Sequence, residues 1–223
     1  MPHEATLLMR QFVTHDVQRL LLTRPDGLDW QPGQGIELAI DQDEWRDQGR
    51  PFTPTSLRED RILELTVKRY PDEDGVTEAL HQLEPGARLL LSDDAFGSIT
   101  YQGPGTFIAA GTGVTPFLGI LRQLAKDDAL LSGHRLLLSN KAERDVISAP
   151  ELAHYLGDEL VLTFTREHAP GQQGRRIDAE FLDAKVADRD GYCYVCGPDG
   201  FVEAMNDALR AIGVPAEKLV YER

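Results

Sequence analysis

The chain has 223 residues, 41% hydrophobic and 27% charged, which is enough to build two hydrophobic cores of ordinary size. Its 37 Asp and Glu exceed its 23 Lys and Arg, and the net charge of −14 argues against nucleic acid as a partner, because phosphates need a basic surface. No apolar run approaches the roughly 20 residues of a membrane-spanning helix, and the N-terminus shows no secretory signal. We therefore expect a cytoplasmic monomer with two domains and no membrane association.

Residues 1–101 contain short segments rich in aliphatic and β-branched residues, separated by turn signals. The segments are TLLMRQFVT, VQRLLLTR, GIELAI, RILELTVKRY and ARLLLSD. Pairs such as Pro32-Gly33 and Pro85-Gly86 separate them, and this pattern predicts an antiparallel β-barrel. One short helix is expected inside this domain, with Thr77 as its capping residue and its end before Pro85.

Residues 102–223 alternate between strand and helix patterns. The four predicted strands are TFIAA, HRLLLSN, LVLTFTR and GYCYVCG, and an amphipathic helical segment follows each of them. Such alternation predicts an α/β domain with a parallel sheet and helices on both faces. Ligands bind such sheets beyond the carboxyl ends of the strands, so the loops at 111–116, 139–145, 166–176 and 196–201 should line one cleft.

The first of these loops, GTGVTPF, contains two glycines after a buried strand. Gly111 and Gly113 allow a sharp turn and a close approach to a ligand, although glycines at such a turn can also serve packing alone. Thr115 is expected as the N-cap of the next helix and Pro116 as its first residue. The free N–H groups of that helix start would form an anion site that suits a pyrophosphate.

The two cysteines, Cys193 and Cys196, have the C-x-x-C spacing of redox and zinc sites. They fall in a predicted strand, where residues i and i+3 point to opposite faces, so we expect two separate thiols. The six histidines show no ligand spacing, and no metal site is expected.

Three motifs together resemble the ferredoxin-NADP reductase family: RPFTPTSL at residues 50–57, GTGVTPF at 111–117 and VCGPDGF at 195–201. They occur in the family's order and cover nearly the whole chain. The resemblance implies an FAD-binding β-barrel domain at 1–101 and an NAD(P)-binding α/β domain at 102–223. It implies an enzyme, an NAD(P)H-dependent reductase that passes electrons through FAD to a separate acceptor.

In the barrel domain the resemblance assigns the cofactor contacts of the flavin. Arg50 would bind the pyrophosphate of FAD, and Phe52, where the family usually has tyrosine, would lie against the flavin ring. Pro51 lies between these two, and Thr53 would place its hydroxyl near the hydride-accepting N5 atom. Read without the other motifs, the same stretch is an ordinary proline-containing loop with an exposed arginine.

Two further segments of this domain carry implied FAD contacts. Val67 and Lys68 belong to the strand that would lead to the flavin, and Gly75, Val76 and Thr77 would bind its second phosphate at a helix start. An ordinary turn before a capped helix is the alternative for the latter segment.

In the α/β domain the resemblance assigns the nucleotide contacts. The residues implied to receive the nucleotide are Gly111, Thr112, Gly113, Thr115 and Pro116. Cys196, Gly197 and Pro198 would lie where the nicotinamide meets the flavin, although Cys196 also suits a simple buried position. Tyr221 is a candidate lid over the flavin and Glu222 a candidate proton carrier, unless they form only a frayed tail. The expected catalytic residues are thus Thr53, Thr115, Cys196 and Glu222.

The nucleotide and the acceptor are the least determined features. Asn140 and Lys141 follow the second strand, where the adenosine ribose would bind, and the stretch NKAERDVI favours NADH over NADPH, with Lys141 and Arg144 supporting NADPH. We expect flavodoxin or ferredoxin as acceptor, docked on a basic patch from residues such as Arg46, Arg58, Arg61 or Arg69. A free flavin or ferric-chelate reductase and a non-catalytic nucleotide-sensing module are the alternatives.

Overall fold

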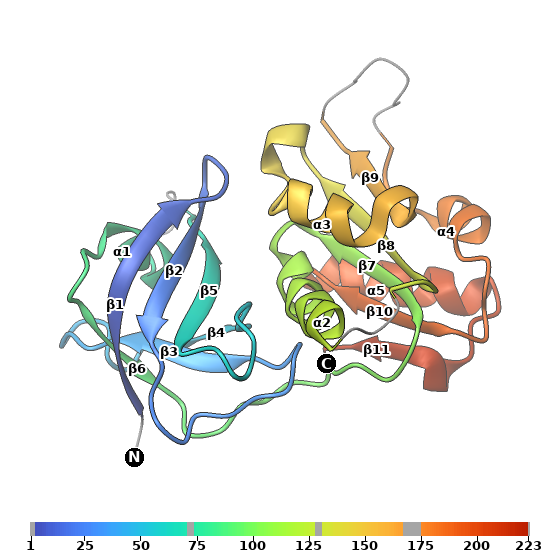
Figure 1. The fold of residues 1–223 in the computed structure, drawn as a ribbon. Coiled ribbons are helices and arrows are strands. Elements are labelled where there is room, and N and C mark those ends of the chain that lie inside the picture. The colour runs from blue at the N-terminus through green and yellow to red at the C-terminus, as the bar shows by residue number, and fades with distance from the viewer. Residues whose placement is uncertain (1–2, 71–73, 128–130, 167–174, 223) are drawn as a thin grey trace. The chain divides into compact units, whose positions relative to one another are not determined.

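The computed structural model describes residues 3–70, 74–127, 131–166 and 175–222. The chain forms two compact units, Met1–Gly97 and Ser98–Arg223 (Figure 1). No helix among the described residues combines the length and the apolar character needed to cross a membrane.

The first unit is a nearly closed antiparallel barrel, as the sequence predicted. Its strands are β1 (His3–Phe12), β2 (Val17–Thr23), β3 (Ile36–Ile40), β4 (Arg50–Phe52), β5 (Ile62–Lys68) and β6 (Arg88–Leu91), in the order β4-β3-β6-β1-β2-β5. An isolated bridge between Pro54 and Leu65 connects the chain after β4 to β5 and so links the two edges of the sheet. Helix α1 (Val76–Gln82) belongs to the same unit.

The interior of the barrel follows the two-residue period of its strands. Leu63, Leu65 and Val67 of β5 point inward beside Leu20 and Leu22 of β2, and all are nearly inaccessible to solvent. Glu64 and Thr66 therefore lie on the outer face of β5, which decides the geometry of the site below.

Two features of the first unit differ from the prediction. Residues 50–52, which were not among the predicted strands, form strand β4, and Pro51 is tolerated there because β4 is an edge strand in the sheet order. Helix α1 begins at Val76, with Gly75 instead of Thr77 as its N-cap. The N–H groups of Glu78 and Ala79 donate to Gly75 O, which places Thr77 inside the first turn.

The second unit contains a parallel sheet with helices on both faces, also as predicted (Figure 1). Its strands are β7 (Gly105–Ala110), β8 (His134–Asn140), β9 (Leu160–Phe164), β10 (Tyr192–Cys196) and β11 (Leu219–Tyr221), in the order β11-β10-β7-β8-β9. Its helices are α2 (Thr115–Lys126), α3 (Ala149–Leu156), α4 (Ala179–Lys185) and α5 (Asp199–Ala211). Helices α4 and α5 cover a core that includes Ile108, Leu137 and Val195.

Strand β11 was not expected, because its three residues at the end of the sequence resemble a tail. It pairs in parallel with β10, with Tyr221 opposite Val195. This pairing fixes the positions of the last described residues relative to the rest of the sheet.

The residues before β7 belong to the second unit. The Tyr194 hydroxyl accepts the N–H groups of Gln102 and Gly103 and donates to Gly103 O at 2.7 Å. Tyr101 stacks on Tyr194, and its hydroxyl lies 3.0 Å from His134 Nε2. The units accordingly divide between Gly97 and Ser98, a few residues before the position 101/102 expected from the sequence.

Candidate active site

The glycine loop after β7 forms a short 3-10 helix, Gly111–Val114, that runs directly into α2. The expected N-cap was wrong: Val114 is the N-cap, Thr115 is the first residue of α2, and Pro116 lies in its first turn. The Thr115 hydroxyl donates to Thr112 O at 3.0 Å, so it closes the loop on itself. Gly111 has φ +55, a conformation that favours glycine over any residue with a side chain.

Gly113 brings two of the sequence motifs into direct backbone contact. A Cβ atom on Gly113 would lie 2.6 Å from the carbonyl carbon of Cys196 and 2.8 Å from Gly197 N. A Cβ atom on Gly197 would lie 3.2 Å from Ala110 Cβ. The second glycine of GTGVTP thus provides the close packing that the third glycine provides in the usual dinucleotide fingerprint. We call Ala110, Gly113, Cys196 and Gly197 the glycine junction.

Glu222 lies beside Cys196, which belongs to this junction. Because Val195 pairs with Tyr221, the next residues along the parallel strands, Cys196 and Glu222, are neighbours. Burial, and secondarily the charge of Glu222, raises the pKa of Cys196 to about 12. Cys196 is therefore a neutral thiol at physiological pH, and Glu222 accepts the N–H of Ser98 at 3.3 Å.

Cys193 confirms the expectation of two separate thiols. Both cysteines are free, and Cys193 is fully buried. Burial, and secondarily the charge of Asp188, raises the pKa of Cys193 to about 12, which leaves it protonated in the core.

Tyr221 lies on the opposite face of the sheet from Cys196 and Glu222. It packs against the core that α5 covers, and its hydroxyl accepts a hydrogen bond from Arg210 at 3.3 Å. Alternation along β11 explains this separation, since Tyr221 and Glu222 are consecutive. The structure thus brings the candidate proton carrier to Cys196 and gives the candidate lid residue contacts within its own unit.

The end of β8 holds a buried amide, and the loops after β8 and β9 hold two cations. Asn140 is only 6% exposed, and its Nδ2 atom has no hydrogen-bond partner among the described residues. Arg166 N donates to Lys141 O at 2.9 Å, so these two residues follow neighbouring strands side by side. Neither side chain forms an ion pair within the described part of the chain. Of the loop expected at 166–176, residues 167–174 lie outside the described residues.

In the first unit, Arg50, Pro51 and Phe52 lie on β4, with Thr53 directly after it. Arg50 and Pro51 are exposed, whereas Phe52 is half-buried against the barrel core. The Arg50 guanidinium donates to Gly49 O at 2.9 Å and contacts no carboxylate among the described residues.

The arginines expected to form a basic patch are mostly neutralised. Arg46 pairs with Asp41 at 2.7 Å, Arg58 with Asp29 at 2.6 Å, and Arg69 with Glu78 at 3.6 Å. Each pairing cancels a charge that an acidic partner would need. The expectation of a basic docking patch on these residues is therefore weakened, and Arg50 remains available to an anion.

The other residues assigned to the flavin have varied surroundings. Val67 points into the core, its carbonyl oxygen lies 2.8 Å from His81 Nε2, and Val76 is also buried. Gly75 and Thr77 are half-buried at the start of α1. The Lys68 ammonium lies 2.7 Å from Asp16, so it already has an anionic partner.

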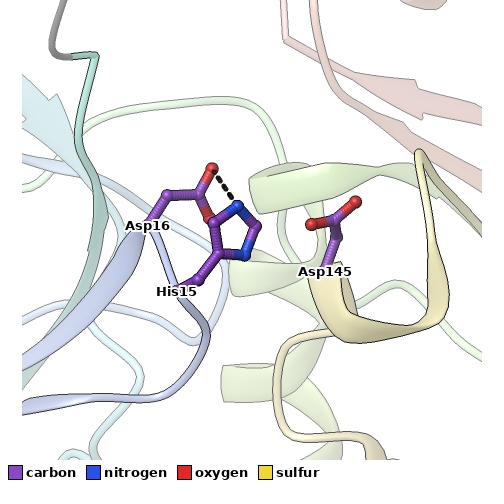
Figure 2. Close-up of side chains that lie close together, drawn as sticks. All are labelled: His15, Asp16 and Asp145. Carbon is purple, nitrogen blue, oxygen red and sulfur yellow. Dashed lines mark ion pairs between the residues drawn. The ribbon is translucent and has the colours of Figure 1, made fainter.

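Asp16 also lies 3.8 Å from His15 Nε2, and the dashed line in Figure 2 marks this pair. The third residue drawn there, Asp145, belongs to the second unit, where its carboxylate accepts the N–H of Ala142 at 2.8 Å.

The sequence motif predicted Arg50 and Thr53 but missed the polar residues that hold their loop. Thr55, Ser56, Glu64 and Thr66 are all buried on the outer side of β5. The two consecutive hydroxyl residues Thr55 and Ser56 were the available signal, because buried hydroxyl groups need hydrogen-bond partners.

Comparison with known proteins agrees with this arrangement. The sequence pattern of the family described as "Oxidoreductase NAD-binding domain" matches residues 107–207. A ferredoxin reductase component of 3-ketosteroid-9-alpha-monooxygenase from Mycobacterium tuberculosis is 28% identical, over 94% of this chain and 62% of that protein. NADH-cytochrome b5 reductase 1 from Candida glabrata is 29% identical, over 77% of this chain and 65% of its own length.

Solved structures share the whole fold. The flavohem-like FAD/NAD binding domain of nitric oxide dioxygenase from Vibrio cholerae O1 biovar El Tor is 26% identical with a TM-score of 0.84, covering 99% of this chain and 97% of that one. The chain spans about three fifths of the length of the Mycobacterium tuberculosis relative. Fold and motifs together define a two-domain oxidoreductase class with a barrel and a nucleotide-binding unit. Residues 107–207 match the oxidoreductase NAD-binding domain, and over nearly its whole length the chain is similar to ferredoxin reductase-like oxidoreductases and to an FAD/NAD binding domain.

Proposed function

We propose that this protein is an NAD(P)H-dependent, FAD-containing reductase that delivers electrons to a separate acceptor. The observation that carries the proposal is the glycine junction, which joins the two nucleotide motifs at the carboxyl edge of the parallel sheet. Ligands bind at that edge in open α/β sheets. Gly111, Thr112 and Gly113 would receive the nucleotide, and Cys196 to Pro198 would border the nicotinamide.

The residues of the barrel suit a flavin nucleotide. Among the described residues Arg50 has no carboxylate partner, which suits a pyrophosphate, and Phe52 offers half-exposed aromatic surface for a ring. Thr53 would supply a hydroxyl to the ring edge. A bound flavin would accept two electrons from the nicotinamide and release them singly.

Residues of the second unit would exclude water from the reacting atoms and supply a proton. As a neutral thiol, Cys196 would exclude water without attacking a substrate, since the thiolate is the nucleophilic form. Glu222 is the carboxylate nearest in register to Cys196, which supports its role as the proton carrier. Thr115 would act by closing the glycine loop through Thr112.

The nucleotide is NADH or NADPH, and two observations favour opposite choices. Asn140, the last residue of β8, stands where an arginine would favour NADPH, and this supports NADH. Lys141 and Arg166 are adjacent, and neither forms an ion pair among the described residues. They support NADPH, because its 2′-phosphate carries additional negative charge. The ratio of kcat/KM for NADPH and NADH decides which nucleotide the protein prefers. A preference for NADPH that disappears in the variant Lys141→Ala/Arg166→Ala would assign the phosphate to these cations.

The acceptor is proposed by class. A small electron carrier such as flavodoxin or ferredoxin agrees with the reductase components among the relatives, and a free flavin or ferric chelate is the second choice. Absorbance of the purified protein tests the core of the proposal. Oxidised-flavin bands that bleach with NADH or NADPH are expected, whereas a colourless protein that takes up no added FAD contradicts it.

A further inference from the structure

The chain around Thr53 changes its pairing partner within a few residues. Phe52 pairs with Ile36 of β3, whereas Pro54 forms a bridge with Leu65 of β5. Thr53 lies between these two attachments. Its position is therefore determined by how firmly the residues on either side are held.

On the β5 side, the attachment is made by a buried polar cluster on the outer face of the strand. Thr55 N donates to Glu64 O at 2.9 Å, and the Thr55 hydroxyl donates to Glu64 Oε1 at 2.7 Å. In return, Glu64 N donates to Ser56 Oγ at 3.0 Å, and Thr66 Oγ1 lies 3.5 Å from the Thr55 hydroxyl. Backbone and side chain of Thr55 thus both bind Glu64.

The carboxylate at the centre of this cluster is costly to bury. Glu64 is 9% exposed and Thr55 is 0% exposed, and Arg19 of β2 lies 3.8 Å from Glu64 Oε2. A buried carboxylate needs hydrogen bonds and charge compensation, and here it receives the hydroxyl of Thr55 and the guanidinium of Arg19. A valine or leucine on this outer face would be simpler for stability alone, so the polar arrangement needs another explanation.

We propose that Thr55 and Glu64 are positioning residues that hold Thr53 and Phe52 in place for reaction with the flavin. They touch neither cofactor nor substrate themselves; they fix the loop that does. The inference rests on the proposed flavin function, but the geometry of the clamp is independent of it. A hydroxyl displaced by about 1 Å from a reacting atom costs a large factor in rate, so loosening this loop should lower kcat more than it changes KM.

The test uses the full chain and the variants Thr55→Val, Thr55→Ser and Glu64→Gln. Thr23→Val is the matched control, because the Thr23 hydroxyl accepts the N–H of Thr6 at 2.8 Å in the same unit, outside the proposed site. Amide hydrogen exchange of Phe52, Thr53 and Thr55 is measured first, since it needs no flavin. We expect exchange about tenfold faster in Thr55→Val, normal exchange in Thr55→Ser, and no change at these three amides in Thr23→Val.

Steady-state reduction of ferricyanide then reports on the reaction. In Thr55→Val we expect kcat to fall about tenfold with KM for the nucleotide nearly unchanged, and Thr55→Ser to restore it. If Thr55→Val does not fold, Glu64→Gln replaces it, with faster exchange and lower kcat again expected. Unaltered exchange and kcat in the folded variants would overturn the proposal. A wild-type protein without flavin would refute the proposed function, and the exchange experiment alone would then decide whether the clamp exists.

Discussion

Arg50 differs from its neighbours in the way its charge is used. Arg46 and Arg58 make close ion pairs with aspartates, whereas Arg50 donates to the carbonyl of Gly49. An ion pair already formed in the free protein must be broken before the cation can bind a ligand anion. Arg50 forms no ion pair among the described residues, so it does not have this cost. It is therefore the better candidate for binding a phosphate.

Replacing Arg50 tests this assignment. In Arg50→Ala we expect FAD affinity to fall by about 10- to 100-fold, since hydrogen bonds to charged groups contribute roughly 1.5–3 kcal/mol. The far-ultraviolet circular dichroism should not change, because the side chain is exposed. The measurement is flavin content after gel filtration, with Arg61→Ala, another exposed arginine of the same unit, as the control. Equal flavin content in both variants would contradict the role of Arg50.

His81 connects α1 to β5 through one hydrogen bond in the core. Its Nε2 atom lies 2.8 Å from Val67 O, and its Nδ1 atom has no partner among the described residues. Burial lowers the pKa of His81, with Arg69 and Arg10 adding to this effect, while the bond to Val67 and the charge of Glu78 oppose it. The neutral ring donates to Val67, and protonation would create a second N–H without an acceptor.

The first unit should therefore lose stability in acid. Because the folded-state pKa of His81 lies below the ordinary value of about 6.5, the unfolded chain takes up this proton first. Stability is fully present above that pH and decreases as the pH falls through 6.5 toward the folded-state pKa, by up to about 1.4 kcal/mol per pH unit. Urea unfolding at several pH values measures the slope, which should be shallower in His81→Gln. An identical slope in both proteins would refute the role of this histidine.

At the level of elements, the glycine junction depends on the absence of one side chain. A methyl group on Gly113 would meet backbone atoms of Cys196 and Gly197, and backbone cannot move aside as a flexible side chain can. Gly200 of α5 provides the contrast, because nothing lies within 4 Å of a Cβ atom there.

Alanine at these two positions should have opposite effects. We expect Gly113→Ala to destabilise the second unit by about 1–3 kcal/mol through overpacking and to weaken nucleotide binding. Gly200→Ala should be neutral or stabilising by up to about 1 kcal/mol, because glycine disfavours the helical conformation. Thermal unfolding and nucleotide titration measure both effects. A Gly113→Ala protein that binds nucleotide like the wild type would show that the junction is not needed for the site.

The elements with strong periodic patterns could be predicted, and the short ones could not. HRLLLSN predicted β8 with the bounds that the structure shows, since a continuous aliphatic run suits a strand buried on both faces. Strand β4 contains a proline and β11 has three residues, so neither carries enough pattern to be recognised. The N-cap at Thr115 was wrong because a 3-10 turn, which no local pattern signals, begins the helix earlier.

The candidate site was predictable only in part. Motifs indicated Arg50, Gly113 and Cys196 as candidates, because special chemistry or backbone conformation restricts the residue types at such positions, and the structure brings Gly113 against Cys196. Contacts between distant segments, such as Glu64 with Thr55 or Arg166 with Lys141, depend on how strands are ordered in the folded sheet. One sequence does not contain that order explicitly.

For the molecule as a whole, the net charge of −14 should govern which acceptors approach it. We expect kcat/KM for the anion ferricyanide to rise with salt, because screening weakens repulsion once the Debye length falls to about 10 Å near 0.1 M. For the cation hexaammineruthenium(III) it should fall. The measurement is initial rate against ionic strength at saturating nucleotide. If kcat/KM instead fell with salt for ferricyanide and rose for hexaammineruthenium(III), the surface at the point of electron transfer would be locally basic.

The hydrogen bonds between Tyr194 and the segment before β7 also determine where a truncated protein can begin. Tyr194 is fully buried, and its hydroxyl is satisfied by Gln102 and Gly103. A truncated gene product that started at β7 would leave this hydroxyl without partners inside the core, at a cost of about 1–3 kcal/mol. One that started at Ser98 would keep both partners and the stacked ring of Tyr101. The seven residues 98–104, which look like a connector, are thus needed for the stability of the parallel sheet.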